Sequence, residues 1–119
     1  MFSGEMDKAF AAFTLATTGA SMGMEVSMFF TFWGLNLLKK GGGPVPNEQL
    51  AQMMAAQKSP SINEFITMAH QLGVKLLPCS TTCSMMGISK EDLRPEASEM
   101  VGAAYFLNES REASITLFI

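Results

Sequence analysis

Hydrophobic residues near the N-terminus recur at the spacing of a helix. Met6, Phe10 and Phe13 fall on one helical face, and alanines fill many of the positions around them. A helix that is apolar on nearly all sides is covered on both flanks in a folded protein. The acidic residues at its start suit the positive end of the helix dipole, and Gly23 is a suitable C-cap. The pattern therefore predicts a long, well-covered first helix.

Two short runs of continuous apolar residues are typical of buried parallel strands. The first spans residues 25–32 and the second spans residues 74–78. Between them, Ser61 and Glu64 carry the signature of a capping box, which predicts a helix that ends at Gly73. The same patterns predict helices at 35–40, 47–56 and 99–111 (the last favoured over a strand), a turn at 89–93 and a final strand at 115–119.

Strands that alternate with helices predict an α/β fold, in which helices cover both faces of a parallel sheet. A chain of 119 residues has room for one hydrophobic core, so we expect one domain over residues 1–119. A flexible stretch is predicted at residues 39–47, where glycines and prolines interrupt the pattern. No internal repeat is visible.

Composition narrows the classes of protein that fit this chain. Apolar residues make up 48% of it and charged residues 16%, which excludes a disordered chain and favours an oligomer that buries additional surface. The formal net charge is −3 and Lys39-Lys40 is the only basic doublet. Nucleic acid is therefore not expected as a partner.

The apolar runs are too short for a membrane span. The longest, residues 28–38, covers about half of the roughly 20 residues that a bilayer requires. The N-terminal residues lack the basic and then apolar order of a signal peptide, so we expect a cytoplasmic protein without a transmembrane segment. In a reducing compartment, two cysteines four residues apart fit a reactive or ligand pair better than a structural disulfide.

The candidate functional residues lie where the predicted strands end, because open parallel sheets bind ligands beyond the carboxyl ends of their strands. Three segments reach this edge. They are Ser3 and Gly4; Thr31, Phe32, Trp33 and Gly34; and Cys79, Ser80, Thr81 and Thr82. Cys79 is the nucleophile among them. Free amides of the following helical turn favour its thiolate, and the neighbouring hydroxyls can donate further hydrogen bonds. A buried cysteine that only packs is the open alternative.

Cys83 lies one helical turn beyond Cys79. It is either a resolving thiol that pairs with Cys79 or a packing residue, and the packing role is the simpler interpretation. The two thiols and Met85 could also hold a soft metal such as monovalent copper, although methionine is abundant throughout this chain. The single histidine, His70, falls off the apolar face of its helix, so neither a zinc site nor a Cys–His catalytic pair is expected.

Several runs in the chain resemble the DsrE/DsrF-like family. They are Phe2 to Ala9, Gly23 to Val26, Phe29 to Leu35, Cys79 to Ile88 and Thr116 to Ile119. The most similar branch is described as peroxiredoxin-like or DsrE-type sulfurtransferases. The run F-F-T-F-W-G-L is quite specific, whereas the resemblance is weakest from Lys39 to Ser59.

The resemblance implies a three-layer α/β/α sandwich with a five-stranded parallel sheet, assembled into a homo-oligomer. It also implies sulfur relay, in which a cysteine takes up sulfane sulfur as a persulfide and exchanges it with a partner such as a TusA-like sulfur-carrier protein. That cysteine falls on Cys79. Cys83 has no fixed counterpart in the family pattern. Relatives carry an apolar strand before the F-S-G run, so we expect a truncated first strand here, through a wrong start, a truncated form or a genuine variant.

Two functions from different classes follow. The first is a persulfide carrier or sulfurtransferase without a cofactor, with Cys79 as nucleophile, hydroxyls and amides of Ser80 to Thr82 as anion stabilisers and Trp33 shaping the pocket. The second is a non-catalytic oligomeric binding module that holds a soft metal or a small ligand.

Overall fold

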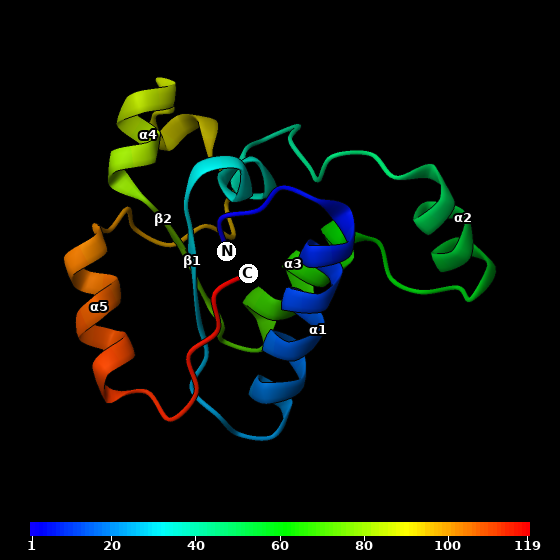
Figure 1. Cartoon of the computed structure of the whole chain (residues 1–119), viewed down its shortest axis with the longest axis horizontal. Coiled ribbons are helices and arrows are strands. Elements are labelled where there is room, and N and C mark those ends of the chain that lie inside the picture. Colours follow the sequence, from blue (N-terminus) through cyan, green and yellow to red (C-terminus); the bar gives the residue numbers. More distant parts are fainter.

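The computed structural model describes all of residues 1–119, and its elements follow one another as helices and short strands (Figure 1). In chain order these are α1 (Met6–Ser21), β1 (Ser27–Phe30), the 3₁₀ helix η1 (Phe32–Leu38), α2 (Glu48–Ala56), α3 (Ile62–Gln71), β2 (Lys75–Pro78), α4 (Ser80–Met86), the 3₁₀ helix η2 (Lys90–Asp92) and α5 (Ala103–Glu112).

The two strands pair in parallel, and helices cover both faces of this small sheet. The register places Ser27 opposite Lys75 and Phe30 opposite Pro78. Successive side chains of a strand point to opposite faces. Phe30 stacks on Phe13 of α1 with ring centroids 6.0 Å apart, whereas its neighbour Phe29 stacks on Phe106 of α5 at 5.1 Å. The predicted α/β architecture is therefore confirmed, with α1 and α5 on opposite sides of the sheet (Figure 1).

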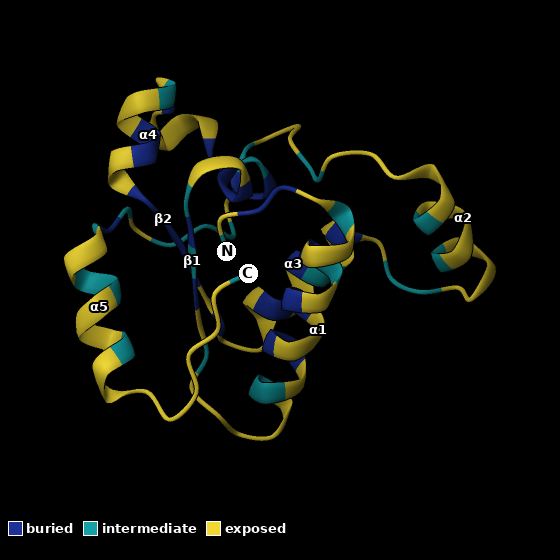
Figure 2. Ribbon diagram, viewed as in Figure 1, coloured by how far each residue is buried: buried dark blue, intermediate teal, exposed yellow.

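The main core lies between the sheet and the pair α1 and α3. Ala9, Phe13 and Ile66 are among its buried residues, and the buried parts of the ribbon meet where these helices face the strands (Figure 2). Alanines in α1 let α3 approach closely, because a methyl group fills little of the space between two helix axes. The prediction of a first helix with core residues is confirmed. Its other side is not covered but faces solvent, and it includes Leu15, which is 54% exposed.

The expected five-stranded sheet is not seen, since the structure has two strands. Further stretches lie beside them but make only two or three backbone hydrogen bonds each. Next to β1, the Met1 ammonium donates to the Phe29 carbonyl oxygen at 2.9 Å and the Thr31 amide donates to that of Met1 at 3.1 Å. Next to β2, the Val101 amide donates to the Pro78 carbonyl oxygen at 3.0 Å. This is the pattern of parallel pairing, over too few residues to form strands.

The predicted strand at residues 115–119 is wrong. This segment has no regular secondary structure, and Ile119 contributes a single carbonyl oxygen, which accepts from the Phe2 amide at 2.7 Å and the Ser3 amide at 3.5 Å. Ile115, Leu117 and Phe118 are exposed. Apolar character favoured a strand, but a strand needs a continuous row of paired backbone groups, and this segment has no such partner.

The stretch predicted as flexible, residues 39–47, is tied to the body at several backbone groups. Lys40 donates to the Asp92 carbonyl oxygen at 2.8 Å, and Val45 donates to that of Gly4 at 2.7 Å. A Cβ on Gly42 would collide with the Asn36 carbonyl oxygen, so glycine is required for this approach. Beyond it, Asn47 is the N-cap of α2, and its side-chain oxygen accepts from the Leu50 amide at 3.0 Å.

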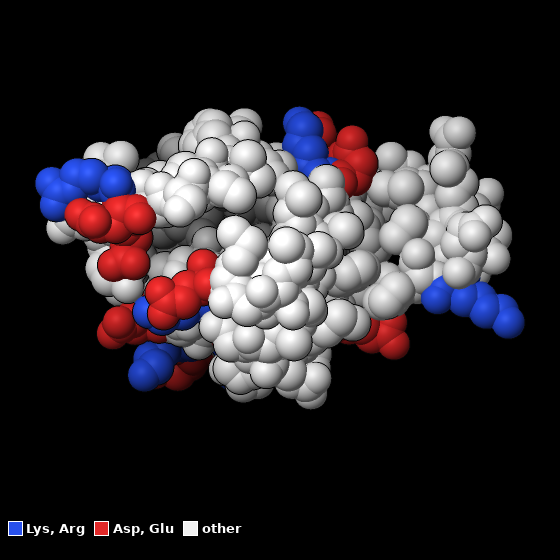
Figure 3. Space-filling view, turned by 90° about the horizontal axis from the view of Figure 1, so that it is seen from below, with Lys and Arg blue, Asp and Glu red and all other residues white.

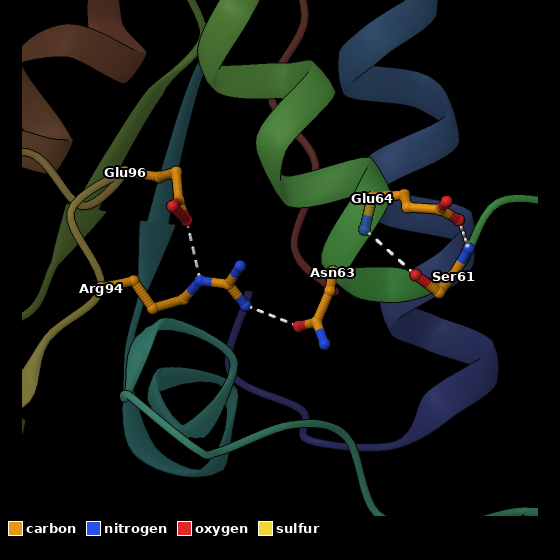
Figure 4. A network of polar contacts seen from close by, with 5 residues as sticks. All are labelled: Ser61, Asn63, Glu64, Arg94 and Glu96. Atoms are coloured by element: carbon orange, nitrogen blue, oxygen red, sulfur yellow. Dashed lines mark hydrogen bonds and ion pairs between the residues drawn. The ribbon is translucent and has the colours of Figure 1, made fainter.

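Helix α2 stands apart from the rest of the molecule. It buries none of its residues, and it projects to the right of the body in Figure 1 between two extended connections. We call residues 46–60, which include α2, the arm. The arm rejoins the body at the capping box of α3, where Ser61 and Glu64 exchange hydrogen bonds as predicted (Figure 4).

A polar network fastens the start of α3 to the loop after η2. Arg94 donates to Glu96 at 2.9 Å and to the side-chain oxygen of Asn63 at 2.7 Å (Figure 4). The Arg94 and Glu96 side chains are 15% and 16% exposed, so this ion pair is less screened than a surface pair. None of the helices combines the length and the hydrophobicity needed to cross a lipid bilayer.

Candidate functional site

The junction between β2 and α4 places a thiol at the carboxyl end of the sheet. Cys79 follows the last residue of β2 and is the N-cap of α4. Its amide donates to the Phe30 carbonyl oxygen at 2.8 Å, and the Ser80 amide donates to that of Val101 at 2.9 Å. Backbone bonds on both sides therefore hold Cys79 between the end of β1 and the residues that precede α5.

Cys79 is nearly buried, at 6% exposure, and its surroundings favour the charged form. Burial alone raises the pKa of this thiol, because a thiolate loses its hydration. Hydrogen-bond donors outweigh that effect and leave the pKa of Cys79 below its ordinary value; they are the amide and hydroxyl of Thr82, the hydroxyl of Thr31 and the amide of Thr81. The neutral thiol makes no capping hydrogen bond, so these donors act mainly on the thiolate.

Two threonine hydroxyls from different strand ends meet beside this thiol. The oxygen atoms Oγ1 of Thr31 and Thr82 lie 2.9 Å apart, although the residues are 51 positions apart in the chain. The Phe32 amide also donates to Thr82 Oγ1, at 3.1 Å. Thr82 is 2% exposed and Thr31 is half-buried. This contact joins the end of β1 to the first turn of α4.

Phe32 belongs to a segment predicted at the edge of the sheet, but its backbone conformation was not predicted. Its φ is +48°, a left-handed conformation that bulky residues rarely adopt. Its side chain remains 49% exposed, so burial of the ring offsets little of the strain. A phenylalanine in an apolar run carries no signal of left-handed backbone, since such positions are usually glycine or asparagine.

Cys83 lies on the same side of α4 as Cys79 but in different surroundings. It is 2% exposed, and both cysteines are free thiols. Burial raises the pKa of Cys83 above its ordinary value, and repulsion from a charged Cys79 raises it further. At neutral pH this thiol is protonated, which suits a packing residue and makes it the weaker nucleophile of the two.

The other residues predicted for the site are distributed unevenly. Ser80 and Thr81 are exposed in the first turn of α4, next to Cys79. Ser3 is buried, and its hydroxyl oxygen accepts from the Glu5 amide at 3.1 Å rather than serving the thiol. A Cβ on Gly4 would come within 2.9 Å of the Trp33 carbonyl oxygen. The two glycines, Gly4 and Gly34, are thus explained by close packing of the N-terminal residues against η1.

Two further candidates face solvent. Trp33 is 63% exposed, so it can border the site but does not fill a pocket around the thiol. Met85 is 66% exposed whereas both cysteines are buried, which does not favour a joint soft-metal site. His70 is exposed, as predicted. The structure contains no cluster of three or more His, Cys, Asp or Glu side chains.

The segments that form the site carry no charged side chain. Residues 1–4, 26–38, 76–89 and 101–108 contain neither acidic nor basic residues. The thiolate of Cys79 is therefore stabilised by amide and hydroxyl dipoles, whereas many reactive cysteines depend on a neighbouring cation.

Fold and site together define an α/β protein with a buried cysteine, its thiolate favoured by hydrogen-bond donors, where a parallel strand meets a helix. The chain belongs to the DsrE/DsrF/DrsH-like family, which it matches over residues 1–49 and 43–118. The family resemblance noted from the sequence is thereby confirmed.

Three relatives show how this chain compares with other members. It is 28% identical to the uncharacterized protein YrkE of Bacillus subtilis, covering all of this chain and 93% of YrkE. A stretch of 37 residues is 57% identical to the sulfur carrier protein DsrE2 of Allochromatium vinosum, covering 31% of this chain and 23% of DsrE2. The uncharacterized protein MJ0760 of Methanocaldococcus jannaschii is 26% identical over 89% of this chain and 35% of MJ0760.

The comparison with YrkE reveals a difference inside the chain. The aligned stretch has 153 positions, whereas this chain has 119 residues, so YrkE contains positions without a counterpart here. The two ranges that match the family overlap at residues 43–49, which include the start of α2.

Proposed function

We propose that this protein carries sulfane sulfur as a persulfide on Cys79. The observation that carries the proposal is the position of Cys79 at the β2–α4 junction, where amides and hydroxyls favour its thiolate, in a chain of the DsrE/DsrF/DrsH-like family. The local similarity to a sulfur carrier protein supports a sulfur-related role.

The chemistry needs only a thiolate and a sulfur donor. The Cys79 thiolate attacks the outer sulfur of a donor persulfide, R–S–SH, and a new S–S bond forms as the old one breaks. The donor leaves as a thiolate, R–S⁻, with the electron pair of the broken bond, and Cys79 becomes Cys79–S–SH. The reverse step passes the sulfur to an acceptor thiolate. No outside oxidant or reductant is required.

A site without charged side chains suits some donors better than others. Thiosulfate carries two negative charges, and no cationic side chain in the site segments offsets its repulsion from the Cys79 thiolate. We therefore expect a thiol persulfide, whose reacting group carries at most one negative charge, to load Cys79 faster than thiosulfate. Because Cys79 is 6% exposed, loading includes a small local movement at the exposed neighbours Phe32 and Trp33.

The test is the intact mass of the reduced protein after exposure to polysulfide, with Cys79→Ala and Cys83→Ala as matched variants. We expect wild type and Cys83→Ala to gain the mass of one sulfur atom, which a reductant then removes. Cys79→Ala is expected to gain none. Equal loading of Cys79→Ala, or loading lost only in Cys83→Ala, would show that the carrier thiol is not Cys79.

Assembly and partner form a second part of this proposal. Fifteen large hydrophobic residues are exposed, which favours a homo-oligomer that covers some of them. Figure 3 shows a broad uncharged area in the middle of one face, with charged side chains toward its sides. Sedimentation velocity tests the oligomer, and transfer of labelled sulfur to or from a purified TusA-like carrier tests the partner that the resemblance implies.

A further inference from the structure

The Thr31 and Thr82 hydroxyls beside Cys79 can donate only a limited number of hydrogen bonds. Thr31 Oγ1 and Thr82 Oγ1 lie at 2.9 Å, a distance at which one of them donates to the other. Each hydroxyl has one proton to donate. The contact between the two oxygen atoms uses one proton, so one proton of the pair remains for another acceptor.

Thr82 Oγ1 already has a fixed donor, because the Phe32 amide points at it from 3.1 Å. Two arrangements are then possible. Either Thr31 donates to Thr82 and the Thr82 proton is free, or Thr82 donates to Thr31 and the Thr31 proton is free. Thr82 occupies the third position of α4, whose backbone amide faces the N-cap side chain, here that of Cys79. The hydroxyls of Thr82 and Thr31 are both placed to donate to the thiolate of this residue.

We propose that Thr31 and Thr82 act as one positioning pair, which supplies a single shared hydroxyl proton to the sulfur anion of Cys79 and can supply it from either residue. The proposal rests on the proposed function in taking Cys79 as the working group. It adds that the two hydroxyls are redundant as donors and act together. Hydroxyl protons rotate without movement of heavy atoms, so the donor can follow the negative charge as it shifts from thiolate to persulfide.

The backbone at Phe32 holds this pair in place. Strained residues persist where the surrounding structure holds them, and they cluster at functional sites. Phe32, with its φ of +48°, directly follows Thr31, and its amide is the donor that orients Thr82. The strain is thus located at the residue that connects both members of the pair.

The test is a double-mutant cycle on a Cys83→Ala background, in which Cys79 is the remaining thiol. Thr31→Val, Thr82→Val and the double variant remove the hydroxyls with little change in shape. The measurement is the rate of alkylation of Cys79 by iodoacetamide as a function of pH. Thr67→Val, at an exposed position of α3, is the matched control.

Redundant donors predict a non-additive result. Each single variant slows alkylation at neutral pH by less than about threefold, because the other hydroxyl still supplies a proton. The double variant slows it by about tenfold or more and moves the midpoint of the pH profile upward, since the anion loses its hydroxyl donor. Serine at both positions restores the wild-type profile. Additive effects, or a double variant that reacts like wild type, would overturn the proposal.

A second measurement covers the case in which the double variant does not fold. Threonine hydroxyl protons of the unmodified pair are followed by NMR while Cys79 is titrated. At least one of the two resonances is expected to move as the thiolate forms, and no movement of either would overturn the shared-proton pair. Persulfide loading is measured separately by intact mass. Non-additive alkylation rates without persulfide loading would support the Thr31–Thr82 pair and contradict the carrier function.

Discussion

At the scale of single residues, Cys79 and Cys83 differ in chemistry although they lie one helical turn apart. Hydrogen-bond donors hold the pKa of Cys79 below its ordinary value, whereas burial and the neighbouring charge raise that of Cys83. Their thiolates therefore form in separate ranges of pH, with Cys79 ionising first. Two cysteines at one helix can thus differ in how readily they ionise, and the thiolate is the nucleophilic form of the group.

This difference predicts the order of chemical labelling. With iodoacetamide, Cys79 is expected to react with a midpoint below the ordinary thiol pKa of about 8.5, and Cys83 with a midpoint above it. Peptide mass spectrometry across the pH range measures both residues in one sample. Preferential labelling of Cys83 at neutral pH would contradict the assignment.

The left-handed backbone at Phe32 predicts an unusual ranking of small residues. At this position glycine is expected to give a more stable protein than alanine, by roughly 1 kcal/mol, because a Cβ is strained at positive φ. At Ala11, an exposed position inside α1, the order is reversed, and Ala11→Gly costs roughly 1 kcal/mol. Urea unfolding of the three variants measures both differences. Phe32→Ala as stable as Phe32→Gly would argue against the left-handed turn.

At the scale of elements, α2 and α3 are helices of similar length with opposite relations to the core. α2 buries no residue, whereas α3 buries Ile62, Ile66 and Ala69. Helices of this length are marginal in isolation, so α2 depends on its own cap and on local bonds. α2 should therefore be able to unfold while the rest of the molecule stays folded.

Proline substitution tests this separation. Gln52→Pro, in the middle of α2, is expected to remove helix signal in circular dichroism while the melting temperature moves by less than about 2 °C. Thr67→Pro occupies an equally exposed position in α3 and should cost about 3 kcal/mol or more, because the whole core depends on that helix. A large drop in melting temperature for Gln52→Pro would reveal contacts of α2 with the body or with a second copy.

At the scale of the whole molecule, the local stability of a segment should depend on whether it contributes to the core rather than on whether it is helical or extended. α1, α3, β1 and β2 share one buried cluster, whereas the arm and the exposed residues 113–118 lie outside it. Hydrogen exchange is therefore expected to be slowest in these four elements and fastest in α2 among the α-helices. Protection of α2 equal to that of α3 would contradict this view.

Much of this organisation was predictable from local signals. The capping box at Ser61 and the apolar run before Cys79 correctly predicted a helix and a strand, because both depend on neighbouring residues. The contact between Thr31 and Thr82 was not predictable as a hydrogen bond, since it depends on the register of β1 against β2. The failed strand at 115–119 has the same origin: apolar character is local, but a strand requires partners elsewhere in the chain.

The site segments carry no charged side chain, and this affects how the reactivity of Cys79 depends on ionic strength. A thiolate stabilised by a nearby lysine or arginine loses part of that stabilisation as salt screens the pair, within a Debye length of about 8 Å at 0.15 M. Hydrogen bonds from fixed amides and hydroxyls act at contact distance, where dissolved ions do not enter. The rate at which Cys79 reacts with a neutral reagent should therefore stay nearly constant from low to molar salt, a property by which this cysteine can be distinguished from cation-activated ones.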